Sequence, residues 1–187
     1  MPTKAPAKRA KAKAPAKGKN STGVPGAMKR IRRLETAAKH LQSMRLIYSY
    51  GGGRIGGHIA KPEVGEKWTD CSGCATYLLD VAGIRLKNDA GSTWSLAEEG
   101  HTGTSEFLTL FIKNNPGDEH VILRLRKRPR PWHFGKTRYR WFECGGTDNP
   151  SSGGGPSFFI PGKGMGITPE ERVKEFNIHR HFKELEA

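Results

Sequence analysis

The residue best suited to chemistry is Cys71, which follows Asp70 at the point where a helix is predicted to begin. Asp is a preferred N-cap residue, and the unpaired backbone amides at a helix start stabilise a thiolate. The same amides, notably those of Cys71 and Ser72, are placed to hold the oxyanion that forms when a thiolate attacks an amide carbonyl. Taken alone, however, Cys71 fits a buried structural thiol better than a nucleophile.

A nucleophilic thiol also needs a base within hydrogen-bond reach and a third group that orients this base. His120 opens a predicted strand, and on an antiparallel neighbouring strand Glu143 would lie beside it and accept its second ring N–H. Taken alone, His120 at a strand edge fits an ordinary solvated histidine better. Asp148 and His181 remain alternatives for the orienting group.

Helices and strands that would position these groups are predicted from the spacing of apolar residues and from turn signals. The first helix carries one apolar stripe, and the second begins at the Asp70 cap. Three strand-like segments are joined by a turn and by a basic loop, so an antiparallel sheet is expected. Helices that precede such a sheet indicate an α+β domain. The predicted bounds are 28–44, 70–82 and 169–176 for helices and 107–112, 120–125 and 139–144 for strands.

The chain has 187 residues and a formal net charge of +14, but the charge is unevenly distributed. Residues 1–33 hold eleven basic side chains and no acidic one, which leaves 21 basic and 18 acidic side chains in residues 34–187. The composition of residues 1–27 predicts a disordered tail, and residues 28–187 are expected to form one domain. The tail would either serve as a solubilising linker or bind DNA, anionic wall polymers or an anionic membrane face through Lys8, Arg9, Lys11, Lys13, Lys17 and Lys19.

Several classes of protein are disfavoured by the same composition. A transmembrane segment is not expected, because the sequence has no run of about 18 apolar residues. The N-terminus lacks the apolar stretch of a secretory signal. Three cysteines, an odd number, argue against a disulfide framework. No metal and no cofactor are expected, because the spacing of a structural zinc site is missing from Cys71, Cys74, Cys144, His179 and His181.

The order of these motifs resembles the NlpC-type cell-wall endopeptidases, a papain-like family of cysteine peptidases. Residues 70–73, Asp-Cys-Ser-Gly, are similar to the nucleophile helix of that family, and residues 47–52, Ile-Tyr-Ser-Tyr-Gly-Gly, resemble its Pro-Tyr-x-Trp-Gly-Gly segment. The resemblance implies that Tyr48 lies beside Cys71 and assists the oxyanion, and that His120 is the base. It places Glu143 where many family members carry histidine.

The resemblance covers roughly residues 36–182 and implies a papain-like NlpC-type domain whose N-terminal helices pack on a small antiparallel sheet. The segment 153–156 and the late Phe176 with residues 180–181 look like a variant found in phage and actinobacterial members. One departure from the family pattern is the acidic pair 118–119 directly before His120. This pair is expected to raise the pKa of the imidazole.

Together these features predict a peptidoglycan hydrolase that cuts amide bonds of stem peptides. Cys71 would attack the carbonyl, His120 would move the proton, Glu143 would hold the imidazole, and Tyr48, Ser72 and Asp70 would position the oxyanion and the substrate. The missing signal sequence favours a phage protein, either carried in the virion tail or acting as a lysin released from the host cytoplasm. A transferase that uses the same thioester remains open. The non-enzymatic alternative is a virion structural protein that keeps the fold and uses its tail on DNA or on neighbouring virion subunits.

Overall fold

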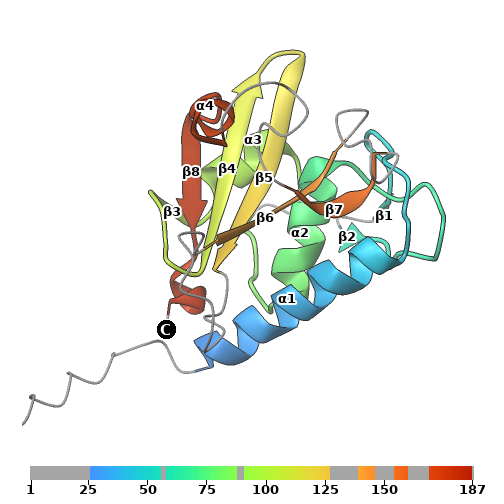
Figure 1. Ribbon diagram of the computed structural model, residues 1–187, viewed down its shortest axis with the longest axis horizontal. Helices are drawn as coiled ribbons and strands as arrows, with labels where there is room; N and C mark the ends of the chain where they lie inside the picture. The colour runs from blue at the N-terminus through green and yellow to red at the C-terminus, as the bar shows by residue number, and fades with distance from the viewer. Residues whose placement is uncertain are drawn as a thin grey trace, which may run out of the picture.

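The computed structural model describes residues 26–55, 58–87, 91–126, 139–145, 154–159 and 169–186 (Figure 1). The tail residues expected to bind polyanions, the basic loop 127–138 and Asp148 lie outside this part of the chain. The described elements form a mixed α+β structure. In chain order they are α1 (Ala27–Ser43), β1 (Arg54–Ile55), β2 (His58–Ile59), α2 (Cys71–Val81), α3 (Thr93–Glu98), β3 (His101–Thr102), β4 (Leu108–Asn115), β5 (Asp118–Arg126), β6 (Tyr139–Cys144), β7 (Pro156–Phe159), α4 (Pro169–Lys174), β8 (Ile178–His181) and a 3-10 turn (Lys183–Leu185). No helix among the described residues is long and apolar enough to cross a membrane.

The two long helices form where the apolar spacing predicts them. α1 begins after Gly26, which adopts a left-handed conformation (φ 83°), and it buries residues at three- and four-residue steps along one face. α2 begins at the predicted cap, because the Asp70 side chain accepts a hydrogen bond from the Gly73 amide. It ends before Gly83, another left-handed glycine (φ 74°). The predicted helix at 169–176 is confirmed in a shorter form as α4.

All six strands of the main sheet are antiparallel and follow the order β3-β8-β4-β5-β6-β7. The three predicted strands are confirmed as β4, β5 and β6 at its centre. The first two strands are longer than predicted, and the turn between the predicted strands 107–112 and 120–125 is shorter. β4 and β5 continue to the pair Asn115 and Asp118 and close around Gly117 (φ 81°). The short strands β3, β7 and β8, the hairpin β1–β2 and the helix α3 were not predicted.

Alternation along the strands divides the buried side chains between the two faces of this sheet. The main core lies between one face and the helices α1, α2 and α3, and it contains Leu110, Val121 and Phe142. A smaller cluster on the other face contains Phe111, Ile122 and Phe176. Figure 1 shows α1 and α2 on the side of β6 and β7, whereas α4 lies beside β8 toward the opposite edge. α2 packs against α1 and, among the strands, mainly on β5 and β6, which carry His120 and Glu143.

Candidate active site

The start of α2, where Cys71 lies, is held by the carboxylate of Asp70. The Oδ1 atom of Asp70 accepts hydrogen bonds from the Gly73 amide (2.8 Å) and the Ser72 hydroxyl (2.9 Å), and Oδ2 accepts one from the Gly51 amide (2.9 Å). The Asp70 backbone oxygen accepts a further hydrogen bond from the Cys74 amide (2.9 Å). Asp70 therefore positions the helix start, and it leaves the amides of Cys71 and Ser72 unengaged by its own oxygens.

Arg54, in β1, pairs with the same carboxylate. Its Nη1 and Nη2 atoms donate to Asp70 Oδ2 and Oδ1 at 3.0 and 2.9 Å, and Nη2 also donates to Ser72 Oγ (2.9 Å) and to the Gly91 carbonyl (3.0 Å). Burial alone would raise the pKa of Asp70, but the hydrogen bonds from Arg54 and the backbone outweigh this effect and lower it. Arg54 was not predicted from the sequence, because an arginine in a glycine-rich segment 16 residues before its partner has no local signature.

The structure brings Cys71, His120 and Glu143 together. His120 Nε2 lies 2.9 Å from Glu143 Oε2. Cys71 lies near enough to the same imidazole to raise its pKa. Because Nε2 is paired with Glu143, Nδ1 is the ring nitrogen left for the thiol. The pairing of Leu123 with Phe142 places Glu143 diagonally across from His120 on the same face of the sheet. Glu143 thus lies beside His120 as expected, and its orienting role stays a prediction.

The environment of His120 favours its charged form. Burial alone would lower its pKa, but the hydrogen bonds and negative charges of Cys71 and Glu143 outweigh this effect and raise the pKa to about 10. From the sequence, the acidic pair 118–119 was expected to raise the pKa of His120. In the structure Cys71 and Glu143 are its main causes, while Asp118 pairs with the ammonium of Lys113 at 2.7 Å. His120 is therefore an imidazolium at neutral pH.

His120 lies where the two apolar clusters meet. Cys71, which raises the pKa of His120, belongs to the main core. The ring of Phe176, whose centroid is 6.1 Å from that of the imidazole, belongs to the smaller cluster. Lys113 pairs with His120 across β4 and β5, and its ammonium lies 5.9 Å from the centre of the Phe176 ring. The imidazole is consequently confined from both sides, with only 18% of its side chain exposed.

Tyr48 lies close enough to Cys71 for the two groups to interact electrostatically. Burial raises the pKa of the Tyr48 phenol, and the nearby charges of Cys71 and Asp70 raise it further, so the phenol keeps its proton. Its segment is pinned to the residues before α2: the Ser49 amide donates to the Thr69 carbonyl (3.1 Å), and residues 47 and 67 form a parallel bridge. The tyrosine segment and the helix start thus form one hydrogen-bonded unit.

Gly73 is required by packing at the start of α2. A Cβ atom at this position would lie 2.0 Å from Thr69 Oγ1 and 3.3 Å from the Ile59 side chain. The Thr69 hydroxyl is itself held, because it donates to the Gly52 carbonyl (2.9 Å). A glycine directly after residues 71 and 72 therefore lets the β1–β2 region approach the first turn of α2.

The other two cysteines are core residues. Cys74 and Cys144 are buried free thiols, and Cys144 Sγ donates to the Thr69 carbonyl at 3.4 Å. Burial raises the pKa of the Cys74 thiol. His179 and His181, considered with these cysteines for a zinc site, lie on β8 and have other partners: the Phe176 carbonyl (2.9 Å) and Glu186 (2.6 Å). Within the described ranges no group of three or more histidine, cysteine or acidic side chains is arranged to hold a metal ion.

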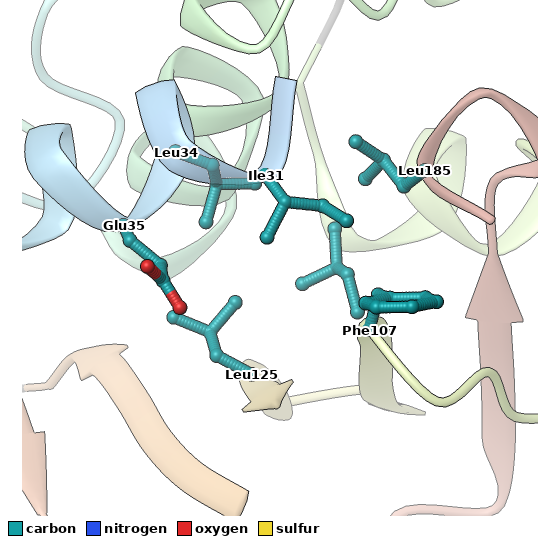
Figure 2. Close-up of a pocket in the computed structure, with 7 residues that line it drawn as sticks. Ile31, Leu34, Glu35, Phe107, Leu125 and Leu185 are labelled. Carbon is teal, nitrogen blue, oxygen red and sulfur yellow. The ribbon is translucent and has the colours of Figure 1, made fainter. Parts of the chain in front are cut away.

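A small apolar hollow lies elsewhere in the molecule (Figure 2). It opens between α1, the ends of β4 and β5 and the C-terminal 3-10 turn, with Glu35 at its border, and its other lining residues are Ile31, Leu34, Phe107, Leu108, Leu125 and Leu185. Leu125 is five residues along β5 from His120, which corresponds to roughly 17 Å. The hollow therefore does not belong to the site around Cys71.

Comparisons with known proteins found no relative. No protein-family model matches the chain, no curated protein matches it, and no solved structure matches it. A functional assignment thus depends on the geometry around Cys71 and on the motifs that surround it.

Proposed function

We propose that this chain is a cysteine peptidase with a papain-like, NlpC-type domain, and that it hydrolyses amide bonds in the stem peptides of peptidoglycan. The observation that carries the proposal is the position of His120: its Nε2 lies 2.9 Å from Glu143 Oε2, and Cys71 lies near enough to the imidazole to raise its pKa together with Glu143. A nucleophile, a base and an orienting group in this order are the components of a thiol triad.

The charge state of the triad suits a thiolate–imidazolium pair. With the pKa of His120 near 10, the imidazole holds a proton at neutral pH. The Cys71 thiolate attacks the amide carbonyl and forms a C–S bond, and His120 then gives its proton to the leaving amine as the C–N bond breaks. A water molecule next attacks the thioester, with His120 taking its proton, which releases the acid and restores the thiolate. Glu143 holds the imidazole in the required orientation throughout.

The oxyanion of each tetrahedral intermediate needs donors close to Cys71. The amides of Cys71 and Ser72 lie at the positive end of α2 and are the two that the Asp70 oxygens leave unengaged. The protonated phenol of Tyr48 supplies a further donor beside the thiol. The peptidoglycan substrate is supported by the resemblance of residues 47–52 and 70–73 to the cell-wall endopeptidases.

Digestion of purified peptidoglycan tests this proposal, with the products identified by mass spectrometry. Wild type and Cys74→Ala are expected to release the same new stem-peptide fragments, and Cys71→Ala is expected to release none. Cys74 is a matched control, because it lies one turn further along the same helix and its thiol is buried in the core. Equal absence of cleavage by wild type and Cys71→Ala, with both proteins folded and the thiol reduced, would refute the hydrolase and favour a structural protein that retains this domain.

A further inference from the structure

We propose that Arg54 is a positioning residue of this site: it neutralises Asp70 and fixes the start of α2, so that Cys71 ionises beside a compensated carboxylate. The inference rests on the proposed role of Cys71 as a nucleophile. If so, a residue of β1 influences the reactivity of the Cys71 thiol, which lies in α2.

The geometry around Arg54 is that of a built ion pair. Both terminal nitrogens meet both oxygens of Asp70, at 3.0 and 2.9 Å, which is the bidentate arrangement that arginine forms and lysine does not. The Asp70 side chain is 8% exposed and that of Arg54 is 26% exposed, so neither partner is strongly screened by solvent. The further bonds to Ser72 and the Gly91 carbonyl leave the guanidinium little freedom to move.

The electrostatic role follows from the order of the residues. A helix start carries a partial positive charge of about half a unit, which favours a thiolate on Cys71. The full negative charge of Asp70 on the preceding residue opposes this effect and is the larger of the two. Arg54 supplies a full positive charge on that carboxylate, so the helix start keeps its net attraction for an anion.

Other titratable groups surround Cys71 and must be considered with Arg54. They are Asp70, Tyr48, Cys74, Cys144 and the His120–Glu143 pair. Of these, only His120 carries a positive charge, and Glu143 already faces it. His120 therefore does not substitute for Arg54 at Asp70.

The test is the pH dependence of Cys71 alkylation by iodoacetamide, with the modified cysteine located by peptide mapping. In Arg54→Met the midpoint of the alkylation profile is expected to rise by about one pH unit, as a like charge nearby shifts a titration, which makes alkylation about tenfold slower below the midpoint. Adding Asp70→Asn should restore most of the rate, because asparagine still caps the helix but carries no charge. Arg54→Lys keeps the positive charge but loses the bidentate hydrogen bonds, and it should shift the midpoint less than Arg54→Met.

Arg30→Met is the matched control. Arg30 Nη1 donates to the carbonyls of Ala82 (3.2 Å) and Gly83 (2.5 Å), so this variant loses an arginine at the other end of the same helix. It is expected to lower the melting temperature without moving the alkylation midpoint. Arg54 would be only a structural tether if Arg54→Met left the midpoint where Arg30→Met leaves it, or if Asp70→Asn failed to restore the rate.

This assay separates the inference from the proposed function, because alkylation requires no substrate. A wild type that cleaves peptidoglycan, together with an unmoved midpoint in Arg54→Met, overturns the role of Arg54 alone. A wild type that cleaves nothing, with the midpoint moved as expected, overturns the hydrolase and leaves Arg54 as a residue that sets the reactivity of the thiol.

Discussion

Replacing Glu143 by glutamine removes the negative charge beside His120 and leaves a side chain of nearly the same size. The distance between His120 Nε2 and Glu143 Oε2 is 2.9 Å, and the carboxylate is 9% exposed, so this is a charged hydrogen bond with little solvent screening. Such bonds contribute about 1.5–3 kcal/mol. Because one pKa unit corresponds to about 1.4 kcal/mol, losing this bond should lower the pKa of His120 by about one to two units.

The pKa of His120 is about 10 in the wild type, so in Glu143→Gln the His120 imidazole should titrate at roughly pH 8–9. The measurement is the imidazole resonance of His120 followed by NMR across this range. Peptide hydrolysis should lose its basic limb at the same lower pH, since the imidazolium is the proton donor. At pH 9 kcat/KM is expected to fall about tenfold or more, because the charged hydrogen bond between His120 and Glu143 is lost.

Glu186→Gln is the control for this experiment. Glu186 pairs with His181 at 2.6 Å, so the variant breaks a second histidine–glutamate pair outside the site. It should leave the titration of His120 and the rate of hydrolysis unchanged. The reasoning is refuted if Glu143→Gln moves the titration of His120 by less than about 0.3 units, or if Glu186→Gln lowers kcat/KM equally.

Two further predictions concern stability. The folded-state pKa of His120, raised from 6.5 to about 10, means that its contribution to stability is fully present below pH 6.5 and is lost as the pH rises toward 10. The gap in urea unfolding free energy between wild type and His120→Gln should therefore shrink across that range, and a constant gap would contradict the assignment. Gly155→Ala places a Cβ 1.8 Å from the Leu46 carbonyl oxygen and should lower the free energy of urea unfolding by about 1–3 kcal/mol. A loss below about 0.5 kcal/mol would show that β7 moves away freely.

The elements that could be predicted have a signal within their own residues. α1 has an apolar stripe at helical spacing, and α2 has Asp70 at its N-cap. The central strands β4, β5 and β6 are continuous apolar or alternating segments bounded by turns. Such patterns depend on the chain over one or two turns, which is why the sequence places Cys71 at a helix start and His120 and Glu143 on neighbouring strands.

The elements that were missed depend on partners far along the chain. β3 and β8 are two and four residues long and pair with each other. β8 also pairs with β4, although Phe111 and its partner His179 are 68 positions apart in the sequence. Segments this short have no periodicity to detect. The same reason hides Arg54, whose four partners come from residues 52, 70, 72 and 91.

The amino-acid sequence by itself determined which groups are available for chemistry and the local structure in which two of them stand: a thiol at a capped helix start and an imidazole on a strand. Only the tertiary structure decided that His120 is paired with Glu143 and lies near Cys71, and that the Asp70 carboxylate is paired with Arg54. The reason is physical. Helix capping and strand alternation act between neighbouring residues, whereas the meeting of α2 with β5 and β6, and of β1 with α2, depends on how the whole core packs.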